Sequence, residues 1–521
     1  MDVGLLLDRQ AQARPHKIAV AAGAQQRTYR QLNQRANQLA NALFRLGIKK
    51  GDRVGVLLPN VVEYLEIYFA LAKLGAIMVL VNWRQGHEEI RFVLQDADAC
   101  ALIVDQSRCP EMPVLWSQLP TLRTIMVVGS TNDCPFISYE GAIAGESSQL
   151  AVDVTLNLDD DQLLLYTSGT TGTPKGAVIT HENTMWNSFN QILDLDLTRH
   201  DSTLVVCPLF HVSGLYDLTF PLLHVGGTVF IANRFDAGQA LATIAEHRIT
   251  TVMTVPTMIY DWLKLPDIEA YDRTSLRLIV CGGAPLPTRI IEDAMARLSP
   301  NFVQGYGLTE GTSVSTFLPS EEGLSRMGSI GKPFMHVELS LLNDAMKVVR
   351  PGEIGEIAIK GKTVVRGYWN LPDETRRNFR HGWFLTGDLA RQDEDGFLYL
   401  VDRKKNMIIS GGENIYPKEL EDLLAYHPAV LEAAVIGVPD ERWGEVVMAV
   451  VVVRPGHSLS ADEVVQYCGL HLASYKKPHY VRFVDDLLRN ATGKVLKEAL
   501  RKQMMPTIFS GGADEPGAMV P

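Results

Sequence analysis

Short apolar segments alternate with helical patterns over most of the chain. Residues 28–47 carry apolar side chains on one helical face, and the apolar run 54–58 follows directly. The same alternation continues to residue 104 and returns between residues 203 and 281. Short strands separated by helices are typical of a parallel sheet with crossover helices. We therefore predict an α/β fold.

The pattern changes near residue 335. From there to residue 401, short apolar strands are separated by turns such as Asp395-Gly396, a dipeptide typical of hairpins. A second αβ pattern begins after Asp402 and extends to about residue 502. A chain of 521 residues is longer than one hydrophobic core usually supports, so two or more domains are expected.

Charge, cysteine spacing and hydropathy exclude several classes of protein. The net charge of −11 argues against a nucleic acid held by a basic face. The six scattered cysteines include no C-x-x-C, which favours reduced cytoplasmic thiols over a disulfide framework or a zinc site. The N-terminus lacks the basic region of a signal peptide, and charges interrupt the most apolar stretch, residues 65–81. We expect a cytoplasmic protein without a membrane span.

Residues 167–176 read Thr-Ser-Gly-Thr-Thr-Gly-Thr-Pro-Lys-Gly and lie between two apolar runs. Glycines let a loop bring its backbone N–H groups close to a ligand, and hydroxyls and an ammonium add further donors. Such a run taken alone is more often a flexible linker. This one is short and leads straight into another apolar strand, so we predict a phosphate-binding loop between two strands.

This loop resembles the signature loop of the adenylate-forming (ANL) superfamily, which includes acyl-CoA synthetases, adenylation domains and beetle luciferases. Further motifs follow in the family's order and extend the resemblance over residues 28–497. They are Pro-Leu-Phe-His at 208–211, Cys-Gly-Gly-Ala-Pro at 281–285, Gln-Gly-Tyr-Gly-Leu-Thr-Glu at 304–310, Thr-Gly-Asp at 386–388, Asp-Arg-Lys-Lys at 402–405, Ser-Gly-Gly-Glu-Asn at 410–414 and Asn-Ala-Thr-Gly-Lys at 490–494.

The resemblance implies that ATP activates a carboxylate as an acyl adenylate, with release of pyrophosphate. This reaction needs neutralisation of charge at the phosphates rather than covalent help from the protein. Mg²⁺ takes oxygen ligands, and the resemblance gives Glu310 as its ligand, with a solvated carboxylate as the alternative. The expected clamp for the β- and γ-phosphates consists of Thr167, Ser168, Gly169, Thr170, Thr171 and Lys175.

For the nucleoside, the resemblance implies two segments around adenine and one carboxylate at the ribose. Asp388 would accept both ribose hydroxyls, because an ionised carboxylate is an acceptor only; an ordinary turn aspartate is the alternative. Arg403 is expected at the ribose or a phosphate. The expected adenine-site residues are Gly283, Ala284, Pro285, Gln304, Gly305, Tyr306, Gly307 and Thr309.

Lys494 matches the family's mobile catalytic lysine, which bridges the carboxylate and the α-phosphate as a point charge. A lone C-terminal lysine is otherwise a solvated charge. Many relatives have a proline where this chain has Leu488, from which we expect a small change of loop stiffness.

The resemblance also places a hinge at Lys405. We therefore predict an N-terminal adenylation domain at 1–402, with a β-rich subdomain at about 335–402. A mobile α+β C-terminal domain at 403–505 and a disordered tail at 506–521 follow.

Coenzyme A is the thiol acceptor that the resemblance implies. The expected tunnel and nucleotide contacts are Ser410, Gly411, Gly412, Trp443, Tyr475 and Lys477. Glycines suit a loop that lines a tunnel, because the pantetheine arm must pass close to the backbone. Packing between domains is the alternative role of Trp443 and Tyr475.

The expected acyl pocket contains no arginine or lysine, which disfavours a second carboxylate on the acid. His211 stands where amino-acid-activating relatives have aspartate, so a free amino acid is also disfavoured. His211 itself is expected as a gate between the acyl pocket and the thiol tunnel, with a hydrogen-bonded core histidine as the alternative. The other predicted pocket residues are Val212, Ser213, Gly214, Tyr216, Val255, Cys281, Gly282, Leu308 and Thr312.

Three functions remain from the sequence. The first is a carboxylate–CoA ligase for an aliphatic, aryl or polycyclic monocarboxylic acid. The second is a ligase that passes its acyl adenylate to a separate carrier protein, and the third is a scaffold that binds acyl adenylate without turnover. Intact Lys494, Glu310 and Asp388 argue against the third. The sequence leaves the oligomeric state open, a homodimer included.

Overall fold

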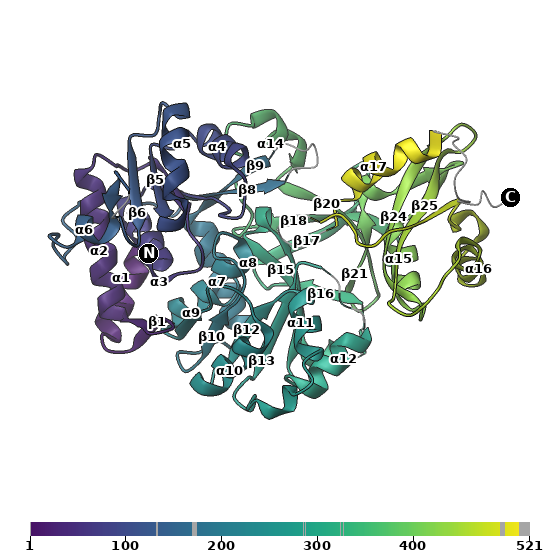
Figure 1. Cartoon of the computed structure of the whole chain (residues 1–521), viewed down its shortest axis with the longest axis horizontal. Helices are drawn as coiled ribbons and strands as arrows, with labels where there is room; N and C mark the ends of the chain where they lie inside the picture. The colour runs from purple at the N-terminus through teal and green to yellow at the C-terminus, as the bar shows by residue number, and fades with distance from the viewer. Residues whose placement is uncertain are drawn as a thin grey trace. The chain divides into compact units, whose positions relative to one another are not determined.

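The structure is a computed structural model that describes residues 2–131, 134–168, 174–284, 286, 288–323, 325–326, 328–489 and 495–509. Its chain divides into two compact units, whose elements are labelled in Figure 1. Unit 1 comprises residues 1–339 and 358–385, and unit 2 comprises residues 340–357 and 386–521. The divisions fall within strands β17 (Val337–Leu342), β18 (Ile354–Gly361) and β20 (Trp383–Gln392).

The first sheet of unit 1 has seven strands in the order β7-β6-β5-β3-β4-β8-β9. Neighbours are parallel except β8 and β9, which form an antiparallel pair at one edge. The strands are β3 (Arg53–Leu57), β4 (Ile77–Leu80), β5 (Ala101–Asp105), β6 (Thr124–Val128), β7 (Ile137–Ser138), β8 (Asp161–Ser168) and β9 (Pro174–Thr180).

The second sheet of unit 1 runs in the order β2-β1-β11-β10-β12-β13-β14-β15-β16. In this order, the successive pairs from β1 to β14 are parallel. The pairs β2–β1, β14–β15 and β15–β16 are antiparallel. The strands are β1 (Ile18–Ala22), β2 (Gln25–Thr28), β10 (Ser202–Val205), β11 (Thr228–Ile231), β12 (Thr251–Thr254), β13 (Leu278–Gly282), β14 (Phe302–Leu308), β15 (Ser313–Leu318) and β16 (Ser329–Pro333).

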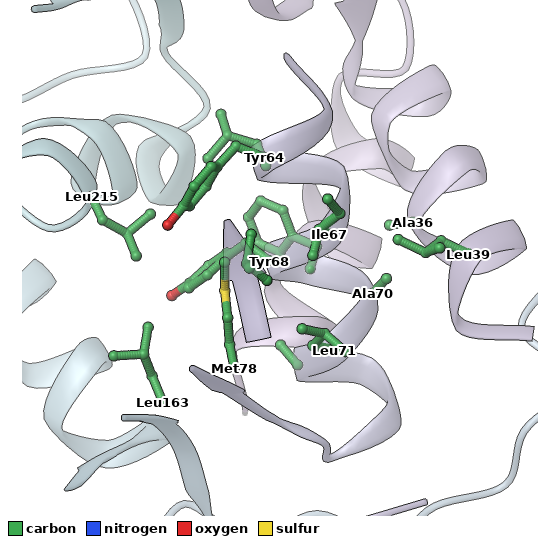
Figure 2. Close-up of a cluster of buried hydrophobic side chains, with 14 of the residues drawn as sticks. Ala36, Leu39, Tyr64, Ile67, Tyr68, Ala70, Leu71, Met78, Leu163 and Leu215 are labelled. Carbon is green, nitrogen blue, oxygen red and sulfur yellow. The ribbon is translucent and has the colours of Figure 1, made fainter. Parts of the chain in front are cut away.

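Helix α3 (Val62–Leu74) lies at the centre of the largest core cluster of unit 1. Figure 2 shows its Ile67 and Leu71 toward α2 (Tyr29–Arg45), while Tyr64 and Tyr68 point to the opposite side. All thirteen residues of α3 are buried, as expected of a helix enclosed on every face.

The other helices of unit 1 precede or connect these strands. They are α1 (Val3–Ala13), α4 (His87–Asp96), η1 (Gln106–Glu111), α5 (Met112–Gln118), α6 (Tyr139–Ile143), α7 (His181–Asp194), α8 (Val212–Leu215), α9 (Thr219–Val225), α10 (Ala237–His247), α11 (Pro256–Leu263), η2 (Ile268–Ala270), α12 (Thr288–Arg297), η3 (Thr309–Gly311), α13 (Ser320–Gly323) and α14 (Pro372–Asn378), with the short strand β19 (Phe379–Arg380).

Unit 2 contains a sheet in the order β23-β22-β25-β24, with β26 parallel to β25. One face packs its valines on helices α15 and α16, and the other face packs on α17. Besides β21 (Leu398–Arg403), its elements are η4 (Lys404–Asn406), β22 (Ile408–Ser410), β23 (Glu413–Ile415), α15 (Pro417–Ala425), β24 (Val430–Asp440), β25 (Gly444–Val453), α16 (Ala461–His471), η5 (Ser474–Lys476), β26 (Tyr480–Phe483) and α17 (Lys497–Phe509).

The predicted fold class is confirmed: a large α/β part with mostly parallel sheets and a small α+β C-terminal part. The boundary at 403–405 stays a prediction, because it concerns a rotation, whereas the two units are defined by packing. Helix α17 reaches Phe509 and buries Leu500 and Met504 against the sheet. The disordered tail likewise stays a prediction. Residues 510–521 lie outside the described part.

The cysteine prediction needs a correction. Cys109 and Cys134 form a disulfide, with Cα atoms 6.2 Å apart, whereas Cys100, Cys207, Cys281 and Cys468 are free and buried. Sequence spacing could not reveal the pair, because its two residues are 25 positions apart and become neighbours only in the folded chain.

Candidate active site

The predicted phosphate loop connects β8 to β9 in unit 1. The two strands pair antiparallel as a hairpin, with Thr167 opposite Lys175 and Ser168 opposite Pro174. Gly169, Thr170 and Thr171 lie outside the described residues. The strands therefore bring Thr167 and Lys175 to the base of the loop, where a phosphate clamp requires them.

Lys175 is buried, and its ammonium group forms an ion pair with the carboxylate of Glu374 on α14. The hydrogen bond from Lys175 lowers the pKa of Glu374, so this carboxylate stays ionised at neutral pH. Lys175 Nζ also lies 5.5 Å from the centre of the Tyr368 ring. A positive charge is thus held beside the phosphate loop by a carboxylate and an aromatic face.

Glu310 lies on η3, directly after β14. Its backbone carbonyl accepts from Val365 N at 2.9 Å, and its side-chain Oε1 accepts from the hydroxyl of Tyr368 at 2.7 Å. No basic side chain among the described residues forms an ion pair with Glu310. An ionised carboxylate with one oxygen engaged by a neutral phenol fits the preference of Mg²⁺ for oxygen ligands.

The predicted adenine segments lie side by side in the second sheet. Gly282 at the end of β13 pairs with Gly305 of β14, and Cys281 pairs with Gln304. The exposed Gly283 and Ala284 follow β13, and Pro285 lies outside the described residues. Ligands of parallel α/β sheets bind beyond the carboxyl ends of the strands, and these segments lie at such ends.

Position 307, within β14, requires glycine because the neighbouring strand passes very close to it. A Cβ atom at position 307 would lie 1.8 Å from the carbonyl oxygen of Ser313 on β15. Because that contact involves backbone, the chain cannot relieve it by a rotamer change. The close approach of β14 and β15 therefore fixes the strand end that carries Tyr306 and Thr309.

Most predicted acyl-pocket residues follow the same strand ends. Val255 follows β12, Cys281 and Gly282 end β13, and Leu308 ends β14. The segment from His211 to Gly214 follows β10 and begins α8. Tyr216 is different, since its ring is fully buried against Tyr68 and Phe220 in the core.

His211 is neutral at physiological pH. Burial lowers its pKa to about 4, and its Nδ1 accepts from Ser213 N at 3.3 Å, which assigns the ring proton to Nε2. Ser213 Oγ also lies 2.9 Å from Nδ1. A neutral imidazole whose Nδ1 already accepts a hydrogen bond is a poor general base. Its role as a gate stays a prediction beside the alternative of a hydrogen-bonded core histidine.

A buried carboxylate that sequence reasoning missed lies beneath this segment. Asp217 Oδ1 accepts from Ser313 Oγ at 2.5 Å and from Gln191 Nε2 at 3.3 Å, and burial raises its pKa to about 7. Ser313, Thr312 and Leu218 all have positive φ, at 89°, 55° and 66°. Strained conformations of this kind persist only where the surroundings hold them, and Asp217 supplies part of that support.

In unit 2, the predicted ribose carboxylate and the predicted arginine are partners. Asp388 on β20 lies opposite Arg403 on β21, and Arg403 Nε lies 3.0 Å from Asp388 Oδ1. Asp388 is buried and lies within β20, and its role at the ribose stays a prediction.

The predicted hinge residue Lys405 lies in η4, between two anchored neighbours. Lys404 pairs with Asp344 at 2.7 Å and with Glu356 at 3.0 Å. On the other side, Asp402 Oδ1 accepts from Asn406 Nδ2 at 3.0 Å, and Asp402 Oδ2 accepts from Lys418 N at 2.7 Å. The contacts beside Lys405 thus join the hinge segment to the start of α15.

The predicted thiol-tunnel loop is the tip of the β22–β23 hairpin. Gly411 donates its N–H to Trp443 O at 2.9 Å, and a Cβ atom there would lie 2.6 Å from the Trp443 ring. Ser410 pairs with Gly444 across β22 and β25. The structure therefore brings Ser410, Gly411 and Trp443 together.

Tyr475 and Lys477 lie on and after η5. Tyr475 is 43% exposed and Trp443 is 42% exposed. The neighbouring Lys476 pairs with Glu419 of α15 at 2.7 Å. Lys494 lies outside the described residues.

The described part of the chain contains no group of three or more His, Cys, Asp or Glu side chains placed to hold a metal. A single carboxylate such as Glu310 suits Mg²⁺, which usually takes one or two carboxylates together with substrate phosphates. Within the same described ranges, no helix has the length and apolar character needed to span a membrane.

Two family models match the chain. One is described as an AMP-binding enzyme and matches residues 7–369, and the other, its C-terminal domain, matches residues 419–494.

Several characterised proteins are similar along nearly their whole length. A feruloyl-CoA synthase of an Amycolatopsis species is 40% identical over 495 residues, which is 95% of this chain and 97% of the relative. A long-chain-fatty-acid–CoA ligase of Mycobacterium tuberculosis is 38% identical over 482 residues, with 92% and 94% covered.

Among solved structures, an o-succinylbenzoate CoA synthetase from Bacillus subtilis superposes with a TM-score of 0.84. That structure is a complex with an acyl-adenylate intermediate. Its sequence is 34% identical to this chain, and the match covers 95% of this chain and 97% of the synthetase chain. The same synthetase with ATP and magnesium gives a TM-score of 0.84 at 33% identity, with 95% and 98% covered.

Proposed function

We propose that this chain, which belongs to the AMP-binding enzyme family, is a carboxylate–CoA ligase that forms AMP. The family matches confirm the resemblance to adenylate-forming enzymes that the motifs indicated. The observation that carries the proposal is the meeting of Lys175 and Glu310 at Tyr368, beside the hairpin that bears the predicted phosphate loop.

In the first half-reaction, a carboxylate oxygen of the acid attacks the α-phosphorus of ATP. The bond to the bridging oxygen breaks, pyrophosphate leaves and an acyl adenylate remains. Negative charge grows on the departing group, so stabilisation has to come from fixed positive groups. Lys175 and the loop hydroxyls are the proposed clamp, and Mg²⁺, when bound at Glu310, would supply further positive charge.

Gly283, Ala284 and the segment 304–307 are the proposed adenine contacts, which the adjacent strand ends support. Asp388 is the proposed acceptor for the ribose hydroxyls, with Arg403 as its ion-pair partner.

The acid is proposed to be an apolar aliphatic, aryl or polycyclic monocarboxylate. Small or apolar side chains at the ends of β12, β13 and β14, and a neutral His211, support a pocket without charge. Relatives named for a hydroxycinnamate and for long-chain fatty acids fit this range.

In the second half-reaction, the thiol of coenzyme A attacks the acyl carbon, and AMP leaves with the former carboxylate oxygen. A thiol pKa of about 8.5 leaves enough thiolate for this step without a strong base. Lys494 is proposed to act in adenylation and to be replaced by the loop of Gly411 and Gly412 after rotation at Lys405.

Transfer to a separate carrier protein is the second candidate, since a carrier presents the same pantetheine thiol. The adjacent Gly411 and Trp443 favour neither acceptor. The oligomeric state stays open, a homodimer included.

A cytoplasmic location is also part of the proposal. Disulfides are rare in that compartment, so the reduced form of Cys109 and Cys134 should be folded as well. A cooperative melting transition in the presence of a reductant would support this.

A panel of carboxylic acids with ATP and Mg²⁺ tests the function. AMP and pyrophosphate should form with an apolar acid, and turnover should continue only with coenzyme A or a carrier. ADP as the nucleotide product would overturn the proposal, and no product with any acid would favour the non-catalytic scaffold.

A further inference from the structure

Tyr368 belongs to a segment that extends the first sheet of unit 1 at its edge. Val178 N donates to Gly367 O at 3.1 Å, and Trp369 N donates to Gly176 O at 2.7 Å, on the two sides of Tyr368. Tyr368 N donates to Thr375 Oγ1 at 3.0 Å. The backbone of Tyr368 is therefore fixed to β9, the strand that carries Lys175.

The side chain of Tyr368 contacts two groups of opposite charge. Its hydroxyl donates to Glu310 Oε1 at 2.7 Å, and its ring centre lies 5.5 Å from Lys175 Nζ. The phenol hydroxyl is the donor in this hydrogen bond, because a carboxylate oxygen is the acceptor.

Glu310 depends on this contact for its side-chain position. Its backbone is held by Val365 N, whereas among the described residues the Tyr368 hydroxyl is the polar group recorded on its carboxylate. Since Oε1 already accepts a hydrogen bond and Oε2 accepts none from the described residues, Oε2 is the more accessible oxygen for a metal. Hydrogen bonds that orient a ligating carboxylate typically change metal affinity by about 10–100-fold when they are removed.

We propose that Tyr368 is a positioning residue for the metal site, which holds Glu310 Oε1 so that Oε2 is presented to Mg²⁺. The inference rests on the proposed function, because it needs Glu310 to be the metal ligand. It adds a residue from a distant segment, 58 positions from Glu310 in sequence. Tyr368 touches no reacting atom and acts through Glu310.

Packing alone is the competing explanation, since the Tyr368 ring also lies 6.2 Å from the Phe379 ring. Tyr368→Phe separates the two explanations, because it keeps the ring and removes only the hydroxyl. Tyr139→Phe is a matched control: Tyr139 also donates to a glutamate, Glu66 Oε2 at 2.7 Å, and lies on α6, outside the candidate site.

The test measures how ATP binding and AMP formation depend on Mg²⁺. Calorimetric titration of ATP into the protein without a carboxylic acid reports binding in the absence of turnover. For Tyr368→Phe we expect the Mg²⁺ concentration at half-maximal ATP binding and at half-maximal AMP formation to rise by about tenfold, from the same range for orienting partners. The KM for the acid should stay near that of the wild type.

Tyr139→Phe should leave both Mg²⁺ midpoints unchanged. A wild-type Mg²⁺ midpoint in Tyr368→Phe, or an equal shift in both variants, would overturn the inference. Glu310→Gln separates this from a failure of the proposed function. If the wild type forms AMP and Glu310→Gln loses its Mg²⁺ response while Tyr368→Phe does not, only the inference has failed. If the wild type forms no AMP with any acid, the proposed function has failed.

Discussion

The predicted site residues around Tyr368 in unit 1 and the predicted coenzyme A contacts Trp443 and Tyr475 of unit 2 are held in opposite ways. Lys175 and Glu310 each have a fixed partner, Glu374 for one and Tyr368 for the other. Trp443 and Tyr475 instead expose 42% and 43% of their surface. Charges that act on phosphates gain from being fixed before the substrate arrives. A long thiol arm that enters and leaves is better served by an accessible surface.

Of the substitutions considered, Lys494→Ala should have the largest effect on activity. We expect adenylation to fall by about 10²–10³-fold, as for the loss of one positioned group that stabilises developing charge. Thioester formation from supplied acyl adenylate should change little. The two half-reactions are measured separately, with Lys502→Ala, an exposed helix residue, as the control. Equal losses in both half-reactions would mean that Lys494 is structural.

Lys405→Pro tests whether thioester formation requires rotation at Lys405. Proline fixes φ and removes the N–H, so it should block rotation at the hinge while each unit stays folded. Thioester formation should fall sharply and adenylation should persist. Lys405→Ala, which leaves the backbone free, is the control. Survival of both half-reactions in the proline variant would place the pivot elsewhere.

The double variant Trp443→Ala/Lys477→Ala tests whether these two residues recognise the nucleotide end of coenzyme A. Stacking of a base on an aromatic ring is worth about 1–3 kcal/mol, and partial exposure favours the lower half of that range. The KM for coenzyme A should therefore rise about tenfold, while free pantetheine, which lacks the nucleotide end, should react as with the wild type. An unchanged KM for coenzyme A would favour a carrier protein as the acceptor.

Asp217→Asn tests, through the melting temperature, how much the buried Asp217 side chain contributes to stability. The pKa of Asp217 is raised from 3.8 to about 7, so its contribution to stability is present below about pH 4 and is lost as the pH rises toward about 7. Each pKa unit corresponds to about 1.4 kcal/mol. Asparagine does not titrate. The melting temperature of the variant should therefore rise relative to that of the wild type between about pH 4 and pH 8.

The exposed Asp153→Asn serves as a control for this stability change. A gap between wild type and Asp217→Asn that stays constant with pH would show that Asp217 is ionised throughout.

The sequence predicted those parts of the site that are contiguous. The two strands that flank the phosphate loop and the strand that ends near Cys281 follow from local apolar patterns, and the structure has all three. Their roles came from the family motifs. A contiguous motif keeps its residues together in any fold that forms its element.

Tyr368 and Glu374 could not be predicted in the same way. Glu374 is 199 positions from Lys175, and Tyr368 is 58 positions from Glu310. Their pairing depends on a segment joining the edge of β9, which no local pattern encodes. Asp217 was missed for a similar reason, since its partner Ser313 is 96 positions away and the aspartate stands in an apolar run that reads as ordinary core.

The most direct test of the central claim follows the oxygen of the acid. With a carboxylic acid labelled with ¹⁸O in its carboxylate, ATP, Mg²⁺ and coenzyme A, mass spectrometry of the products shows which bond is made and broken. Attack on the α-phosphorus followed by thiol transfer predicts that AMP carries one labelled oxygen. Unlabelled AMP, or label in inorganic phosphate beside ADP, would contradict the account.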